Sequence, residues 1–162
     1  MTAIQRGLLV ALIQVLIVTS LGGVLLWDRA HRPRLWLETA PVDPDLPIRG
    51  RYVQLRTPVE ARGFKDQQWN QRARLEVEGS TLVAIADLRG STTVRLAEDG
   101  TASFAQPLAY FIPEDVRDPS VRPDGETLWV EVTIPAKGPP RPIRLGVMRD
   151  GGTGEPTPLS LR

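Results

Sequence analysis

Cysteine is absent from this 162-residue chain, and histidine occurs once, as His31. The lack of cysteine excludes disulfides and thiolate metal sites. A single histidine argues against imidazole metal clusters and against Ser-His-Asp catalysis elsewhere in the chain. Lysine is also rare: Lys65 and Lys137 lie in polar or Pro/Gly-rich stretches, where an amine stays hydrated and is not activated for Ser-Lys catalysis. No glycine-rich phosphate loop is present, so we expect no catalytic residue, cofactor or metal.

Net charge is small as well, at +1. Arg6 is the only charged side chain before Trp27, and beyond that point 19 basic residues balance 19 acidic ones. A neutral domain lacks the basic field that nucleic-acid binding requires. Only Arg29, Arg32 and Arg34, which directly follow Trp27, are placed to touch anionic lipid head groups.

The chain does contain one long uncharged run, over residues 7–27. At about 1.5 Å per residue, its helix would be roughly 32 Å long, which matches a hydrocarbon core of about 30 Å. Trp27 stands where an interfacial aromatic residue belongs. We therefore expect a six-residue flank over 1–6 and a transmembrane helix over 7–27. Gln14, Ser20, Gly22 and Gly23 are its candidate helix–helix contacts, because small residues permit close approach and a buried amide needs a partner.

A cleaved signal peptide is the alternative interpretation of this run. Signal peptides have a shorter apolar region and end in a small-x-small site. Here the best cleavage site, over residues 18–20, lies inside the run, so we expect an uncleaved anchor. The basic residues beyond Trp27 favour a cytoplasmic location for that side, but large domains translocate largely regardless of charge. We expect the N-terminus in the cytoplasm and the C-terminal domain in the periplasm.

The remainder of the chain is rich in proline and glycine and reads as short strands joined by turns. We expect a mainly β fold: a stalk over residues 28–46, a compact antiparallel β domain over 47–150 and a tail over 151–162. Alternating or apolar runs, with turn residues at 79–80 and 99–100, predict strands at 51–57, 75–78, 82–88, 93–96, 101–104, 108–112, 127–134 and 143–148.

Two short motifs carry a family resemblance. "DPDLPIRGRYVQL" is followed some sixty residues later by "YFIPED". The pair resembles the GDYXXLXY family of small membrane-anchored bacterial proteins of uncharacterised function. Matching positions are Gly50, Tyr52 and Leu55 in the first motif and Tyr110, Phe111, Pro113 and Glu114 in the second. Arg51 replaces the family's aspartate, and Thr57 its final tyrosine.

The resemblance implies a periplasmic domain beside multi-spanning membrane partners, and it supplies no reaction. From the residues themselves, Gly50 permits a sharp turn into the strand, Tyr52 covers the sheet and Leu55 is core. Arg51 cannot cap a turn as aspartate would. We interpret residues 47–55 as a corner of the scaffold with a secondary role in recognition. The acidic loop after Glu114 lacks calcium-loop spacing and is interleaved with arginines, so we expect local ion pairs there.

These observations predict a membrane-anchored, non-enzymatic accessory protein that binds an integral membrane protein. The alternative is a small-ligand or cell-wall-fragment binding domain, or a hydrolase built on carboxylates. That alternative requires a pocket joining Tyr52, Tyr110 and Glu114.

Overall fold

The computed structural model describes residues 2–42, 52–64, 70–97 and 100–161, and the chain forms two compact units, Met1–Arg32 and Pro33–Arg162. The first unit is the helix α1 (Ala3–His31). Its first turn is a capping box: Gln5 N donates to Thr2 Oγ1, and Thr2 N donates to Gln5 Oε1 at 2.8 Å. The span Ile4–Trp27 is apolar and long enough to cross a membrane. α1 therefore includes the predicted 7–27 and extends past both ends, because the apolar run marks the hydrocarbon core rather than the helix termini.

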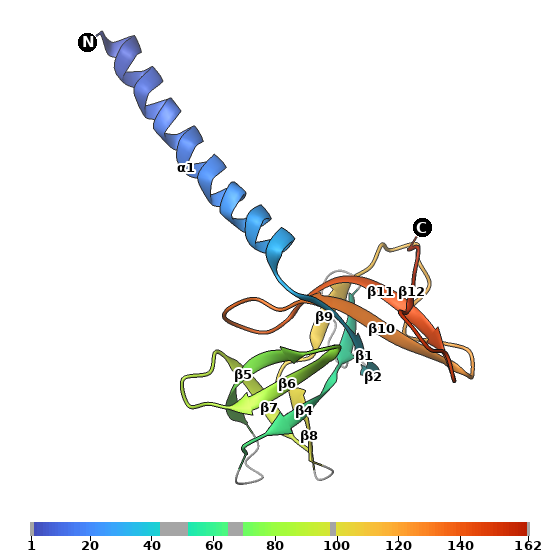
Figure 1. Cartoon of the computed structure of the whole chain (residues 1–162). Coiled ribbons are helices and arrows are strands. Elements are labelled where there is room, and N and C mark those ends of the chain that lie inside the picture. Colours follow the sequence, from blue (N-terminus) through green and yellow to red (C-terminus); the bar gives the residue numbers. More distant parts are fainter. Residues whose placement is uncertain (1, 43–51, 65–69, 98–99, 162) are drawn as a thin grey trace. The chain divides into compact units, whose positions relative to one another are not determined.

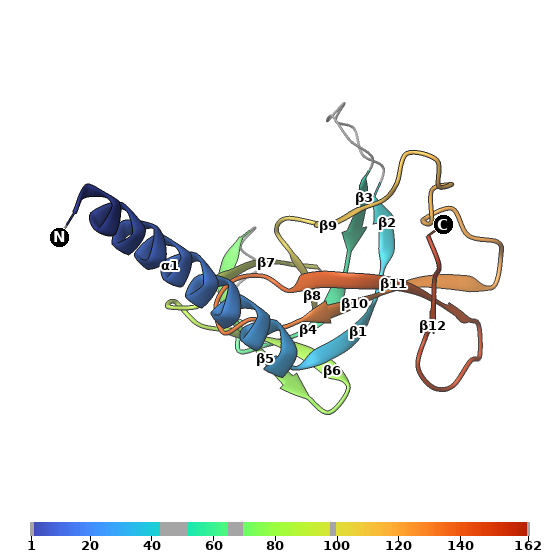
Figure 2. The ribbon, with the colours of Figure 1, turned by 90° about the horizontal axis from the view of Figure 1, so that it is seen from above.

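The second unit consists of strands, which confirms a mainly β fold behind one apolar helix. Figures 1 and 2 show the strands grouped into three sheets. One sheet has the order β1 (Arg34–Glu38), β10 (Glu126–Thr133), β11 (Arg141–Arg149), β12 (Thr157–Pro158); the next has the order β2 (Ala40–Val42), β3 (Tyr52–Arg56), β9 (Leu108–Phe111). The third is a closed barrel of β4 (Pro58–Arg62), β6 (Thr81–Ala86), β5 (Gln71–Glu78), β7 (Thr92–Leu96) and β8 (Thr101–Phe104).

The centre of the first sheet is β10. Leu128, Val130 and Val132 alternate along it and are buried, as the sequence predicted. The opposite face of β10 is also covered, since Glu131 and Thr133 are each only 6% exposed. We call the face that carries Trp129, Glu131 and Thr133 the second face of β10; a tryptophan-lined cavity lies on it.

The segment expected to be a stalk, residues 28–46, contains β1 and β2. Leu35 pairs with Val132 and Leu37 with Val130 in an antiparallel register, and both leucines are buried. Of the prolines and aspartates that suggested a stalk, Pro41 lies within β2, and those over residues 43–47 lie outside the described residues. The expected tail over 151–162 likewise contains β12, and Leu159 N donates to the carbonyl oxygen of Leu145 at 2.9 Å.

β3 and β4 follow each other with one residue between them. Val53, Leu55, Thr57 and Val59 alternate along this stretch and are all buried. The stretch therefore passes from the β2-β3-β9 sheet into the barrel while keeping one face in the core. The sequence predicted the first half of this alternation and not β4.

Both predicted hairpins are confirmed inside the barrel. β5 and β6 meet with Glu78 opposite Thr81, and Gly79 takes φ of 61°, which favours glycine. β7 and β8 pair antiparallel as well. Among the described strands, β4 and β6 form the one parallel pair, because β4 is inserted between β6 and β8 to close the barrel.

Candidate functional site

The two family motifs meet where β3 pairs with β9. Tyr52 is opposite Phe111, and Val53 is opposite Tyr110. Leu55 is 0% exposed and belongs to the core, as expected. Gly50 and Arg51 lie outside the described residues.

Tyr52 and Phe111 share the outer face of this sheet. Their ring centroids are 6.2 Å apart, with the planes tilted by 55°. Phe111 is 75% exposed, whereas Tyr52 is half-buried. The Tyr52 hydroxyl accepts a hydrogen bond from Gln54 Nε2 at 3.3 Å. The result is an exposed aromatic pair built from one residue of each motif.

Tyr110 faces the other way. Because it pairs with Val53, its side chain lies on the inner face of the sheet, where it packs against the core. Pro113 and Glu114 follow the end of β9 and are exposed. Tyr52 and Tyr110 thus lie on opposite faces of one sheet and cannot line a single pocket. The binding hypothesis based on Tyr52, Tyr110 and Glu114 loses its support.

The acidic loop between β9 and β10 is held by local contacts. Asp118 Oδ1 accepts from both the backbone nitrogen and the hydroxyl of Ser120, at 2.8 and 2.7 Å. Glu126 lies 3.7 Å from Arg122 and 3.6 Å from Arg149. Across the described ranges of the chain, no group of three or more metal-ligating side chains is close enough to hold an ion.

A second charged group lies on the barrel. Arg62 of β4 forms ion pairs with Glu78 at 2.8 Å and with Glu60 at 3.3 Å. The hydrogen bond and charge of Glu78 raise the pKa of Arg62, and Glu60 adds to the effect. Arg62 is therefore a permanent cation with a structural role, because no ordinary pH removes its proton.

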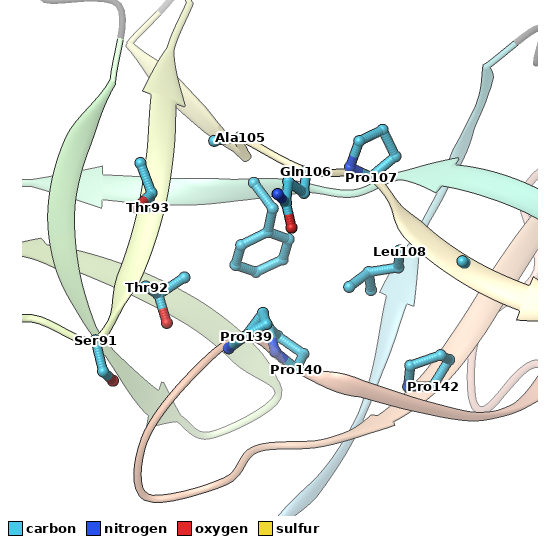
Figure 3. A pocket seen from close by; sticks show the side chains of 12 residues that line it. Ser91, Thr92, Thr93, Ala105, Gln106, Pro107, Leu108, Pro139, Pro140 and Pro142 are labelled. Carbon is cyan, nitrogen blue, oxygen red and sulfur yellow. The ribbon is translucent and has the colours of Figure 1, made fainter. Parts of the chain in front are cut away.

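A cavity of about 500 Å³ lies between the barrel, β9 and the β10–β11 connection. Figure 3 shows Pro139 and Pro140 of that connection on one side and Pro107 and Leu108 on the other. None of the described residues that line it is charged. Nearby hydroxyls fasten the connection: Thr92 Oγ1 donates to the carbonyl oxygen of Gly138 at 2.9 Å, and Gly138 N donates to Ser91 Oγ at 2.8 Å. Its described lining therefore offers hydroxyl, amide and apolar groups but no titratable side chain for acid–base chemistry.

A larger cavity, of about 690 Å³, lies on the second face of β10. Trp36, Trp129, Glu131 and Arg144 line it. None of these residues belongs to a motif in the sequence. The alternation over residues 127–134 places Trp129 and Glu131 on one face of a strand, but β1 lies within the expected stalk, so no sequence pattern connects Trp36 with them.

The candidate helix–helix contacts lie on α1. Gln14 and Ser20 are exposed, and Ser20 Oγ donates to the carbonyl oxygen of Ile17 at 2.8 Å. A side chain added at Gly22 or Gly23 would meet nothing within 4 Å. Thr19 and Gly23 are four residues apart and share a face of the helix. This spacing is that of a small-xxx-small pair.

Together these features define a β-rich domain preceded by a helix that is apolar enough to span a membrane. The chain belongs to the GDYXXLXY family: the family model, described as GDYXXLXY protein, matches residues 25–145. This confirms the resemblance drawn from the two motifs. No curated protein and no solved structure matches the chain.

Proposed function

We propose that this chain is a non-enzymatic accessory protein of the bacterial inner membrane. In this proposal α1 is an uncleaved anchor with its N-terminus in the cytoplasm, and the β domain lies in the periplasm. The domain acts by binding an integral membrane protein beside which it is anchored.

The observation that carries this proposal is the exposed pair of Tyr52 and Phe111. A phenylalanine that is 75% exposed on a regular strand contributes nothing to the core of its own domain. Outside α1, the described chain exposes only two other large apolar side chains to a similar degree, Leu88 and Val121. Phe111 forms an aromatic pair with Tyr52. Aromatic residues are enriched at protein interfaces, where they supply contact area at low entropic cost.

The membrane helix supports the same role. Its residues are apolar on every side, so no polar stripe marks it as a surface helix of a soluble domain. Gln14 places an amide at membrane depth, where a partner's polar group would stabilise it. Thr19 and Gly23 leave room for a second helix to approach closely.

Copurification from a mild detergent tests the partner role. We expect the tagged wild-type chain to recover one integral membrane protein in near-stoichiometric amount. Phe111→Ala should lose most of that partner, since the phenylalanine ring supplies the contact. Leu88→Ala is the matched control: Leu88 is 93% exposed and follows β6 of the barrel, outside the sheet that carries Tyr52 and Phe111, so its removal should leave recovery unchanged. Recovery of the lone chain from wild type, or equal recovery with Phe111→Ala, would contradict the proposal.

A topology reporter tests the orientation. A periplasm-dependent enzyme fused after Arg162 should be active, and a cytoplasm-dependent reporter at the same position should be silent. The opposite pattern, with both fusions well expressed, would reverse the orientation.

A further inference from the structure

The cavity on the second face of β10 is lined by indole and charged side chains, which are lacking among the described residues that line the proline-lined cavity. Its walls are the outer face of β1, β10 and β11, the β5–β6 turn, and the segment over residues 154–156. The volume of about 690 Å³ lies within the range of roughly 300–1,000 Å³ that small-molecule sites occupy.

Trp36 is held rigidly in this cavity. Its ring lies so close to Gly146 that a Cβ there would come within 2.7 Å of the indole. The Arg144 guanidinium lies over the ring, 5.3 Å from its centroid, and the same guanidinium pairs with the buried carboxylate of Glu131. An aromatic ring fixed by a glycine, a cation and an ion pair is preorganised, so it loses little entropy when a ligand stacks on it.

Trp129 supplies a second indole with an unused donor. In the described part of the chain its Nε1 is buried and has no hydrogen-bond partner. Burying a donor without an acceptor is unfavourable, and a ligand oxygen that reached Nε1 after a small shift of the indole would relieve that cost. Trp129 also lines an adjoining cavity of about 290 Å³, which shares Trp36, Ser80 and Thr81 with the first. Both indoles therefore line both cavities, which we together call the groove.

The charges around the larger cavity cancel. Its charged lining residues are two arginines and two glutamates: Arg34, Arg144, Glu131 and Glu155. Arg144 and Glu131 already neutralise each other. A site with no net field gives no advantage to an anion or a cation, but these side chains still offer donors and acceptors to a neutral polar ligand.

We propose that this groove binds a neutral oligosaccharide. A sugar ring combines an apolar face, which packs on a flat indole, with a rim of hydroxyls that donate and accept hydrogen bonds. Two tryptophans, an unsatisfied indole N–H and balanced polar side chains complement both properties. A purely apolar ligand would leave the polar groups unpaired. The inference is independent of the partner role. The groove lies on the sheet that contains β1, β10 and β11, whereas Tyr52 and Phe111 lie on the β2-β3-β9 sheet.

Titration of the full-length chain with chitotetraose, a neutral N-acetylated tetrasaccharide, is the direct test. The chain is kept in a polyoxyethylene detergent, because sugar-headed detergents would compete for the groove. Calorimetry and tryptophan fluorescence should show saturable binding with a spectral shift. The de-N-acetylated tetramer has the same backbone with positive charges, and it should bind at least tenfold more weakly. No binding of chitotetraose or of the neutral maltotetraose, or equal binding of the charged tetramer, would overturn the proposal.

Variants locate the site. Trp129→Phe keeps the apolar ring but removes the donor, and we expect roughly a fivefold loss of affinity, the worth of one hydrogen bond. Trp36→Leu removes the platform and should abolish binding. Trp27→Phe replaces an indole outside the groove and should change nothing. Thermal unfolding identifies any variant that fails to fold. Unchanged affinity in a folded Trp129→Phe protein and in a folded Trp36→Leu protein would show that the groove is not the site.

Discussion

The ring of Trp36 occupies the space that a side chain at Gly146 would need, although 110 residues separate them in the sequence. A Cβ at Gly146 would come within 2.7 and 2.8 Å of two ring carbons and 3.1 Å of the Pro156 Cβ. We expect Gly146→Ala to lower the free energy of unfolding by about 1–3 kcal/mol, the cost typical of overpacking. Denaturant titration measures this. In a chain that carries Trp36→Leu, Gly146→Ala should lower the free energy of unfolding by less than it does in the wild-type chain. Strictly additive effects of the two substitutions would contradict the contact.

Thr57, which stands where the family motif has tyrosine, carries a buried hydroxyl for which the described residues supply no hydrogen-bond partner. Thr57→Val removes this polar group at nearly constant shape, so we expect stability to rise by about 1 kcal/mol. Thr39→Val is the control. The Thr39 hydroxyl is also buried but donates to the Leu128 carbonyl oxygen at 2.8 Å, so its removal should destabilise by a similar amount. Loss of stability in Thr57→Val would show that its hydroxyl is satisfied.

Leu55 is fully buried at the junction between the β2-β3-β9 sheet and the barrel. We expect Leu55→Ala to destabilise the domain by about 2–5 kcal/mol, because it leaves a cavity in the core. Leu88→Ala, at a side chain that is 93% exposed, should change stability by less than about 0.5 kcal/mol. Equal melting temperatures for the two variants would refute the assignment of Leu55 to the core.

The ion pair of Arg144 and Glu131 is asymmetric. The Glu131 side chain is 8% exposed, whereas that of Arg144 is 48% exposed. Arg144→Ala leaves a buried carboxylate without its cation, and we expect a loss of about 1–3 kcal/mol. Adding Glu131→Gln removes the stranded charge and should restore part of that loss. A double variant less stable than Arg144→Ala would contradict this explanation.

Anchoring through α1 predicts a simple fractionation. The chain should remain in the membrane pellet after an alkaline wash, and its N-terminus should lie before Ser20. Release into the aqueous fraction, or a mature chain that begins beyond Ser20, would remove the basis for the anchored role.

The sequence predicted those strands that are marked by their own hydrophobic alternation or by adjacent turn residues. The alternation from Leu128 to Ile134 predicts β10, and turn residues at 79–80 predict the β5–β6 hairpin. β1 was missed because its strand character depends on a partner almost a hundred residues away. The run Leu35-Trp36-Leu37 is too short to be recognised without knowledge of Val130 and Val132.

The candidate sites, too, were predicted only where a local motif marks them, and not where they depend on strand pairing. The motifs predicted Tyr52, Leu55 and the second motif as candidate interaction residues. The family match confirms the resemblance. They could not reveal that Tyr52 joins Phe111 while Tyr110 faces inward, because that depends on the register between β3 and β9. Trp36 and Trp129 carried no motif, and only the pairing of β1 with β10 brings them together.

The pairing of β1 with β10 also sets the order of events during synthesis. The first strand after α1 emerges early, yet its register partners, such as Val132 for Leu35, are made about a hundred residues later. Until then Leu35 and Leu37 have no sheet to cover them, and the new strand presents two bare hydrogen-bonding edges. The nascent chain is therefore most vulnerable to aggregation and proteolysis during that interval, and a ribosome stalled before residue 126 yields a product that cannot complete its fold.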